Sequence, residues 1–157
     1  MTEQAQKIYI GCDPGLSGGF VVLSETGAVI EVFKTPETIQ AFAESLGKYG
    51  DPEKYVVTLV KERVHSMPKN GAKSNFTFGY TIGVLESAIS FYRIRHFDIT
   101  PQTWMKYYMM KKDPSETDTA WKNRLKARAM GLFPQSKIAL WNSDAFLIAE
   151  YARQVYR

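Results

Sequence analysis

The sequence contains a single cysteine, Cys12, and no long run of apolar residues. One cysteine cannot form a disulfide within the chain, and it excludes a zinc site built from several cysteines. A membrane-spanning helix would need an apolar run of roughly 18 residues. The opening residues also lack the basic and then apolar layout of a signal peptide. We therefore expect a protein of a reducing compartment, such as the cytoplasm.

Internal repeats, low-complexity stretches and linker-like segments are absent as well. Apolar residues make up 45% of the chain and charged residues 23%, which is ordinary for a globular protein and unlike a disordered one. With 157 residues the chain can bury one hydrophobic core but has little room for a second. We predict a single domain over residues 1–157.

Positive charge is concentrated in one part of the chain. The net charge is +4, yet residues 101–137 alone carry eight Lys or Arg against three acids, a local charge of +5. The eight are Lys106, Lys111, Lys112, Lys122, Arg124, Lys126, Arg128 and Lys137. A second basic cluster consists of Lys61, Arg63, Lys69 and Lys73. Such clusters suit a polyanionic partner, because each phosphate contact releases counterions. A solvated helix face is the alternative interpretation.

Alternation of apolar residues predicts the strands. Residues 7–13 place Ile8, Ile10 and Cys12 on one side of a strand that ends at a Pro-Gly turn. Short strands around residues 20–23 and 29–33 complete an antiparallel meander. The β-branched stretch 55–60 and the short segment 95–99 predict two further strands.

Helix signals follow the meander and separate the later strands. Capping residues and apolar residues at helical spacing predict five helices. Three span residues 36–47, 75–92 and 121–132, another begins at Pro101, and the last begins at Asn142. The resulting order is three strands, helix, strand, helix, strand and three helices. This order predicts an α/β fold with a five-stranded sheet flanked by helices.

The predicted helix 75–92 is richer in apolar residues than packing on one sheet requires. Its seam has spacings of 4-3-4-3 and consists of Phe78, Ile82, Leu85, Ile89 and Tyr92. One sheet can cover only one face, and further apolar groups lie at other angles, namely Phe76, Tyr80, Val84 and Phe91. Gly79 and Gly83 would permit another backbone to approach closely. We expect a second copy of the same helix to pack there and form a homodimer. Complete burial of this helix within one chain is the alternative.

Three carboxylates stand out by their positions. Asp13 ends the first strand, Glu62 follows the fourth, and Asp144 falls in the first turn of the last helix within an apolar segment. Acids from two strand ends and a helix end are the ligands that two Mg²⁺ ions need for phosphodiester cleavage. Taken singly, the same acids would serve as a turn residue, an ion-pair partner of Arg63 and a helix cap. Their joint placement favours the metal site.

Four segments resemble the RuvC-type Holliday junction resolvases, in order and over nearly the whole chain. Residues 10–20 (IGCDPGLSGGF) resemble the opening motif of that family, and residues 62–68 (ERVHSMP) with 76–79 (FTFG) are similar to the second motif of its phage members. Residues 100–104 (TPQTW) and 143–151 (SDAFLIAEY) resemble the later segments. The resemblance implies a ribonuclease H-like fold with a mixed sheet.

The resemblance also implies roles for the carboxylates. By position Asp13, Glu62 and Asp144 would be the catalytic acids that bind Mg²⁺, with Mn²⁺ as a substitute. Bacterial members carry another acid one turn before the last, where this chain has Trp141. Asn142 could supply an oxygen in its place, or the fourth ligand could come from elsewhere.

DNA contacts are expected from the two basic clusters and from residues near the second motif. His65 stands where bacterial members place an aromatic residue that stacks on bases, and Phe76 is a second candidate for stacking. Lys61 is either a strand-edge lysine or a contact to the scissile phosphate. The expected DNA-binding set is Lys61, Arg63, His65, Lys69, Lys73, Phe76, Lys106, Lys111, Lys112, Lys122 and Arg124.

The expected function is a magnesium-dependent endonuclease that resolves Holliday junctions as a homodimer, in the cytoplasm of a bacterial cell or a phage-infected host. Two active sites related by a two-fold axis suit symmetric nicks in a four-way junction. A less selective nuclease of forks and flaps is one alternative. A junction-binding protein without catalysis, suggested by Trp141, is another. A sugar kinase of the actin-like class is disfavoured because the chain is about half the required length.

Overall fold

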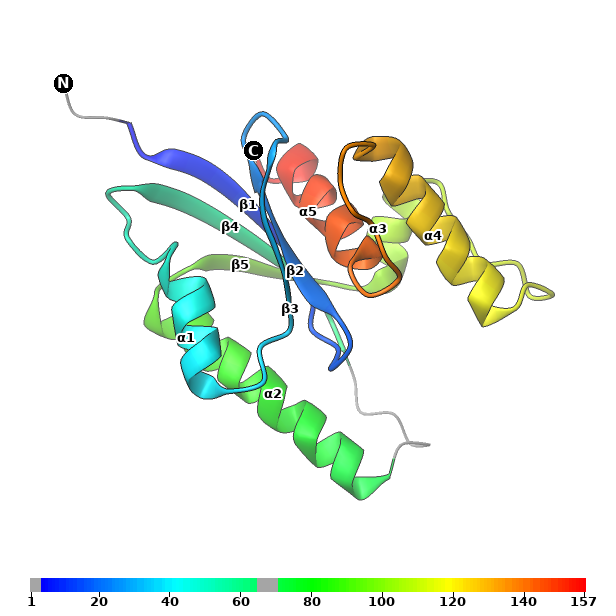
Figure 1. Ribbon diagram of the computed structural model, residues 1–157, viewed down its shortest axis with the longest axis horizontal. Helices are drawn as coiled ribbons and strands as arrows, with labels where there is room; N and C mark the ends of the chain where they lie inside the picture. The colour runs from blue at the N-terminus through cyan, green and yellow to red at the C-terminus, as the bar shows by residue number, and fades with distance from the viewer. Residues whose placement is uncertain (1–3, 65–70) are drawn as a thin grey trace.

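The chain folds into a five-stranded mixed sheet with helices on both faces, as Figure 1 shows for the computed structural model. The structure describes residues 4–64 and 71–157. The predicted fold class and the predicted order of strands and helices are confirmed. The elements are β1 (Gln6–Asp13), β2 (Gly19–Ser24), β3 (Val29–Lys34), α1 (Ile39–Gly47), β4 (Tyr55–Glu62), α2 (Ala72–Phe91), β5 (Arg95–Ile99), α3 (Pro101–Tyr107), α4 (Asp118–Leu132) and α5 (Ser143–Val155).

The sheet has the strand order β3-β2-β1-β4-β5. The first three strands pair antiparallel, whereas β4 runs parallel to β1 and β5 runs parallel to β4. Parallel neighbours end at the same edge of a sheet. The register that pairs Cys12 with Lys61 therefore brings the next residues, Asp13 and Glu62, to that edge together.

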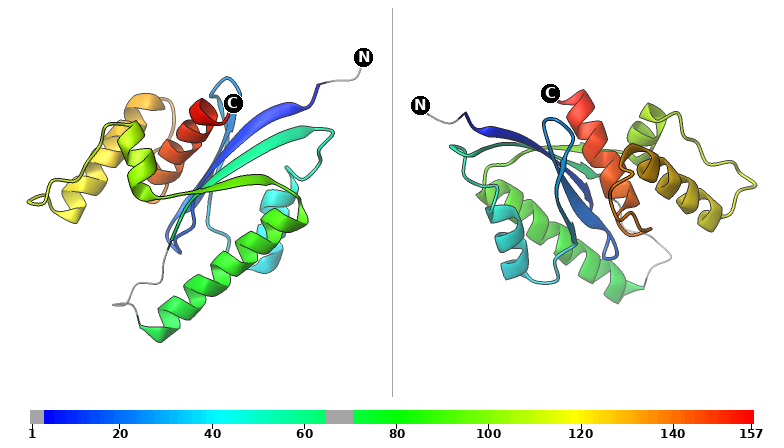
Figure 2. Two further views of the ribbon diagram at one scale, coloured as in Figure 1. Left: turned by 180° about the vertical axis from the view of Figure 1, so that it is seen from behind. Right: turned by 45° about the horizontal axis from the view of Figure 1, so that its top comes forward.

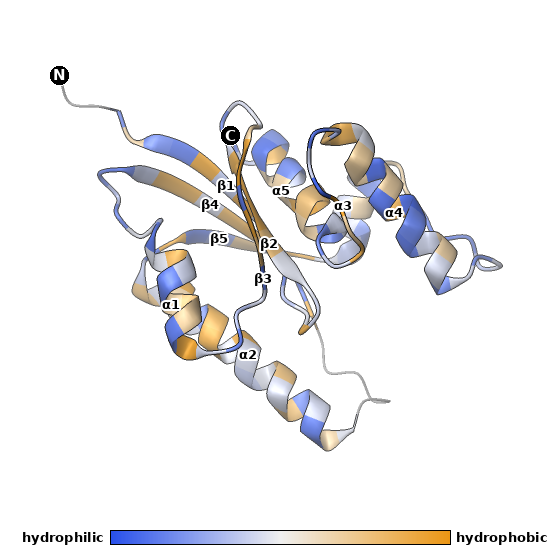
Figure 3. Cartoon of the chain, viewed as in Figure 1, coloured by the Kyte–Doolittle hydropathy of each residue, from blue (hydrophilic) through white to orange (hydrophobic). Residues whose placement is uncertain are grey.

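Side chains alternate between the two faces of the sheet and build a separate core on each. Tyr9, Leu23 and Val60 pack with residues of α3, α4 and α5, whereas Ile8 and Ile10 pack with residues of α1 and α2. The two views in Figure 2 show the sheet between these helical layers. Colouring by hydropathy shows apolar central strands and a largely hydrophilic α4 (Figure 3).

Helix α5 lies unusually close to the central strand β1. A Cβ atom on Gly11 would lie 2.2 Å from the Ala149 amide nitrogen and 2.3 Å from the Ala145 carbonyl oxygen. Glycine in the strand and alanines in the helix therefore permit a backbone approach that larger side chains would block. This packing places the first turn of α5, with Asp144, next to the end of β1.

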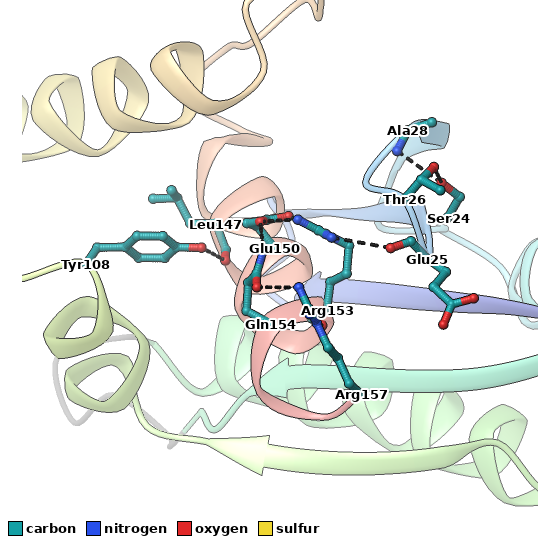
Figure 4. A network of polar contacts seen from close by, with 10 residues as sticks. All are labelled: Ser24, Glu25, Thr26, Ala28, Tyr108, Leu147, Glu150, Arg153, Gln154 and Arg157. Carbon is teal, nitrogen blue, oxygen red and sulfur yellow. Dashed lines mark hydrogen bonds and ion pairs between the residues drawn. The ribbon is translucent and has the colours of Figure 1, made fainter.

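Polar contacts hold the remainder of α5 in place (Figure 4). Glu150 accepts hydrogen bonds from Arg153, 2.6 Å and 2.8 Å long, and Arg153 donates to the Glu25 carbonyl in the turn after β2. The Tyr108 hydroxyl donates to the Leu147 carbonyl across a distance of 2.6 Å. These contacts fix the helix that carries Asp144 to the turn after β2 on one side and to the end of α3 on the other.

Helix α2 is packed along only part of its length. Leu85, Ala88 and Ile89 are buried, whereas Phe76 is 76% exposed and Tyr80 and Phe91 are also exposed. The half of the helix that comes first in the chain projects beyond the sheet in Figure 2. The alternative prediction that this helix is completely buried within the chain is therefore wrong.

No helix among the described residues is long and apolar enough to cross a membrane.

The basic segment between α3 and α4 is partly a loop. Helix α3 ends at Tyr107, so Lys111 and Lys112 lie in the connection to α4, which begins after the Thr117 cap. The Thr117 hydroxyl accepts a hydrogen bond from the Ala120 amide. The predicted helix after Pro101 is thus present but short.

Candidate active site

The three predicted carboxylates lie at one edge of the sheet. Asp13 and Glu62 end the adjacent parallel strands β1 and β4, and Asp144 lies in the first turn of α5. The three carboxylates lie close enough for their negative charges to interact. Asp13 and Asp144 both raise the pKa of Glu62, and Asp13 also raises the pKa of Asp144. The structure therefore brings together the residues that the sequence separates by many positions.

Burial and mutual repulsion make these carboxylates reluctant to ionise. Burial is the main reason that the pKa of Glu62 rises to about 7 and that of Asp144 to about 6. Burial also raises the pKa of Asp13, opposed by a hydrogen bond from the Gly15 amide and by attraction to Lys122 of α4. A nearby cation would relieve this repulsion, so the electrostatics fit a divalent metal ion.

Carboxylate oxygens fit Mg²⁺, an ion that proteins seldom enclose completely with their own side chains. Among residues 4–64 and 71–157, no three Asp, Glu, His or Cys side chains converge tightly enough to hold an ion by themselves. Mg²⁺ commonly takes one or two carboxylates and completes its shell with water and substrate phosphates. Oxygen ligands at an open edge match that preference, with Asp13, Glu62 and Asp144 as the residues that would hold it.

Trp104 of α3 orients Glu62, a role that sequence reasoning missed. Its Nε1 donates a hydrogen bond to Glu62 Oε2 across 2.9 Å, and its ring is fully buried. A buried tryptophan nearly always needs an acceptor for its N–H group. That requirement was the available signal, but the sequence does not indicate which acceptor is near.

The turn after β1 holds Asp13 in place. The Gly15 amide donates to Asp13 Oδ1 across 3.2 Å, and the Thr35 hydroxyl donates to the Gly15 carbonyl across 2.9 Å. A Cβ on Gly18 would lie only 2.2 Å from the Asp13 carbonyl oxygen. The glycines of the opening motif thus allow the turn to fold back tightly on the carboxylate.

Neither Trp141 nor Asn142 is placed as a metal ligand. The Trp141 ring packs against Gly19, with the Lys34 ammonium 5.5 Å from the ring centroid. Asn142 is buried and closes the loop before α5, accepting a hydrogen bond from the Ala139 amide and donating to the Lys137 carbonyl. The amide oxygen suggested as a substitute ligand is therefore used in the loop.

Lys61 is a structural residue, which corrects the expectation that it contacts DNA. Its side chain is only 6% exposed and forms ion pairs of 2.6 Å with Glu86 of α2 and 2.8 Å with Asp98 of β5. Burial lowers the pKa of Lys61, but the hydrogen bonds to Asp98 and Glu86 outweigh it and leave the pKa raised. The ammonium group is thus engaged inside the fold and is not presented to a phosphate.

The other expected DNA-binding residues lie on two surfaces. Phe76 and Lys73 are exposed on the projecting part of α2, and Arg63 follows β4. Around α3 and α4 the basic residues are exposed, although Lys112 pairs with Asp118 and Arg124 pairs with Glu116. His65 and Lys69 lie outside the described residues. The exposed residues near α3 and α4 are Lys106, Lys111, Lys112, Lys122 and Arg124.

Comparisons with known proteins give a fold and no sequence relative. No protein-family model matches this sequence, and no curated protein matches it. The structure resembles RuvC of T. thermophilus in complex with a Holliday junction substrate, with a TM-score of 0.62, 17% identity, and coverage of 95% of this chain and 96% of that chain. A second structure of Thermus thermophilus RuvC gives a TM-score of 0.57 at 14% identity, covering 94% and 96% of the two chains. The fold is therefore RuvC-like, of the ribonuclease H-like type.

The raised pKa values predict that the metal-free protein loses stability as pH rises. Glu62 has a folded-state pKa of about 7 against an ordinary 4.5, so the folded state binds more protons than the unfolded state between those values. Between pH 5 and pH 8 the free energy of unfolding should fall by roughly 2–3 kcal/mol from Glu62 alone. Urea unfolding in EDTA across this range measures the effect.

Two variants and added Mg²⁺ separate this effect from a general pH dependence. Glu62→Gln removes the group with the highest of these raised pKa values and should make the profile shallower, with a smaller fall left from Asp144. Glu53→Gln, in an exposed turn, should preserve the full fall. Mg²⁺ should raise the melting temperature more at pH 8 than at pH 5, because protons compete with the cation for the same oxygens. A wild-type protein whose stability rises from pH 5 to pH 8 would contradict the electrostatic description of the site.

Proposed function

We propose that this chain is a magnesium-dependent endonuclease that resolves Holliday junctions. The observation that carries the proposal is the meeting of Asp13, Glu62 and Asp144 at one edge of a RuvC-like sheet. The neighbour with the same fold was solved with a Holliday junction substrate, and a basic surface adjoins the edge in this chain. The resemblance of the segments around Glu62 and Phe76 to the second motif of phage members favours the phage-like branch of that family.

The chemistry proposed is hydrolysis of a phosphodiester bond. Mg²⁺ held by carboxylates of this set, with water and phosphate oxygens as further ligands, would supply charge neutralisation at the phosphate and a more acidic water. The Gly15 amide and the Trp104 indole hold Asp13 and Glu62 in position. Lys122, whose charge acts on Asp13 and Asp144, adds positive charge where a scissile phosphate would bind.

The nick pattern tests the substrate class. A four-way junction with each strand labelled in turn should be cut at symmetric positions in two opposing strands. Nicks confined to one arm, with equal activity on forks and flaps, would support the less selective nuclease. Junction binding without any nick would support the non-catalytic alternative, which the absence of an acid at Trp141 motivates.

Paired nicks would need two active sites, and α2 offers a surface for a second copy. An apolar groove of about 670 Å³ lies between α1 and α2. Ile39, Tyr80 and Phe91 line it and are exposed. A groove of this kind on a self-complementary helix favours a two-fold dimer.

Gly83→Leu should therefore convert a dimer into a monomer. A Cβ at Gly83 meets nothing within 4 Å, so the larger side chain fits the single chain but obstructs a second helix in the groove. Light scattering at micromolar concentration should give a mass near twice 17.9 kDa for the wild type and near 17.9 kDa for the variant.

Gly131→Leu is the matched control, because a Cβ at Gly131 of α4 also meets nothing within 4 Å. This variant should remain a dimer. A wild-type monomer that still cuts junctions would contradict the role of α2 and would leave a nuclease with one active site.

A further inference from the structure

A pocket between α3 and the start of α4 is separate from the three carboxylates of the candidate site. It has a volume of about 690 Å³. Its lining includes the apolar side chains of Met105, Met109, Met110 and Trp121 together with Lys106 and Lys111. Lysines are present in the lining and no acid is. The pocket therefore combines soft apolar groups with positive charge.

Met109 occupies a backbone position that normally favours glycine. It follows the last turn of α3 with φ of 54°, and the amides of Met109 and Met110 donate to the carbonyls of Lys106 and Met105. This pattern is a Schellman motif, in which the left-handed residue is usually glycine. A side chain on a left-handed residue is strained, because its Cβ crowds the following carbonyl oxygen.

The Met109 side chain adds nothing to the core that would offset this strain. It is 91% exposed and belongs to the pocket lining. Methionine is flexible and polarisable and makes favourable contacts with flat aromatic rings. An exposed methionine on a strained residue beside an apolar pocket is suited to close over a planar ligand.

The two helices that line the pocket, α3 and α4, also contribute residues to the carboxylate edge. Trp104, which precedes Met105, donates a hydrogen bond to Glu62. Lys122, which follows Trp121, lies near enough to act electrostatically on Asp13 and Asp144. Each helix that lines the pocket thus also carries a residue that acts on a carboxylate of the site.

The charge pattern of the pocket selects the ligand class. Lys106 and Lys111 form no ion pair within the described part of the chain, whereas Lys112 pairs with Asp118. Two available ammonium groups beside an apolar lining match a phosphate joined to a planar base. An acidic peptide would also find positive charge, but Lys106 and Lys111 belong to the basic segment 101–137 that is expected to contact DNA, which favours nucleic acid.

We propose that this pocket binds one unpaired nucleotide of the branched DNA, with its base against Met105 and Met109 and its phosphate at Lys106 and Lys111. The inference rests on the proposed function and deepens it, because it assigns a site for a base that branching has released from its partner. Aromatic bases are accepted on such surfaces regardless of exact sequence.

The test combines abasic DNA with a variant that should not harm the fold. A series of four-way junctions carries a single abasic nucleotide at successive positions around the crossover, and affinity is measured by fluorescence anisotropy in EDTA. The wild type should lose about tenfold in affinity at one position in a strand. Met109→Gly removes the side chain and relieves the left-handed strain, so it should fold at least as stably as the wild type.

The proposal predicts that Met109→Gly no longer distinguishes the abasic junction from the intact one. The control is Met130→Ala. Met130 is also an exposed methionine, but it lies in α4 and outside the pocket lining, so this variant should preserve the tenfold difference. A double-mutant cycle between Met109 and the base should then be non-additive.

The outcomes separate the pocket from the nuclease proposal. Tight junction binding with no sensitive abasic position would overturn the pocket assignment and leave the nuclease standing. A sensitive position that Met109→Gly leaves unchanged would overturn the pocket as well. Failure to bind a four-way junction at all would overturn the proposed function itself.

Discussion

Asp13→Asn is expected to reduce the rate of junction cleavage by about a hundredfold or more while leaving the fold and DNA binding intact. The carboxylate ends β1, and burial beside Glu62 and Asp144 leaves it suited to a cation. Asparagine has nearly the same shape, and its oxygen can still accept the hydrogen bond from the Gly15 amide. The change therefore removes charge with little effect on packing.

Single-turnover cleavage and anisotropy measure the two halves of this result. Asp51→Asn is the matched control, because Asp51 lies in the turn before β4, at the opposite end of that strand from Glu62. It should cut at the wild-type rate. Near-normal nicking by Asp13→Asn would show that the carboxylate edge is not the catalytic centre.

Junction affinity is expected to fall about a thousandfold between 50 and 200 mM salt. Of the eight basic residues in 101–137, Lys112 and Arg124 form ion pairs within the protein. The other six should be available for phosphates, which gives a slope of about −5 for log affinity against log salt. The six are Lys106, Lys111, Lys122, Lys126, Arg128 and Lys137.

Replacing Lys106 and Lys111 together with alanine should flatten that slope by roughly two units and weaken all DNA sequences alike. Lys54→Ala, a lysine in the turn before β4 that pairs with Asp51, should leave the slope unchanged. The Met109→Gly variant should also leave it unchanged, since methionine carries no charge. If the salt slope of binding is unchanged by the two substitutions, Lys106 and Lys111 belong only to a solvated face.

Much of the fold was predictable because its elements have strong local signals. Alternation in residues 7–13 and the β-branched run before Lys61 identify strands that a helix would pack poorly. The parallel placement of β4 beside β1 then follows from the resemblance and brings Asp13 and Glu62 together. The unusual position of Asp144 was also visible in the sequence, because a carboxylate within an apolar helix must be paired, must cap the helix or must bind a metal ion.

The residues that support the site were harder to predict, because their roles depend on contacts distant in the sequence. Trp104 and Glu62 are separated by 42 positions and meet only when α3 packs beside β4. Lys61 was expected to face DNA, but α2 and β5 supply carboxylates that hold it inside the fold. Asn142 likewise is engaged by the backbone of its own loop.

The extent of α2 shows the same limit. The 4-3-4-3 spacing identified one helix, but only part of the seam is buried, including Leu85 and Ile89. Sequence periodicity reports which residues share a face, whereas the position of the helix on the sheet decides which of them are covered. The exposed apolar residues outside the seam, Phe76, Tyr80 and Phe91, are what the dimer prediction uses.

Cleavage of a four-way junction by the wild-type protein, with and without Mg²⁺, tests the central claim most directly. The substrate is compared with linear duplexes that contain the same arm sequences. The account predicts paired nicks in the junction when Mg²⁺ is present, none in EDTA, and little cutting of the linear DNA. Tight junction binding with no cleavage at any Mg²⁺ or Mn²⁺ concentration would contradict it and would identify a junction-binding protein without catalysis.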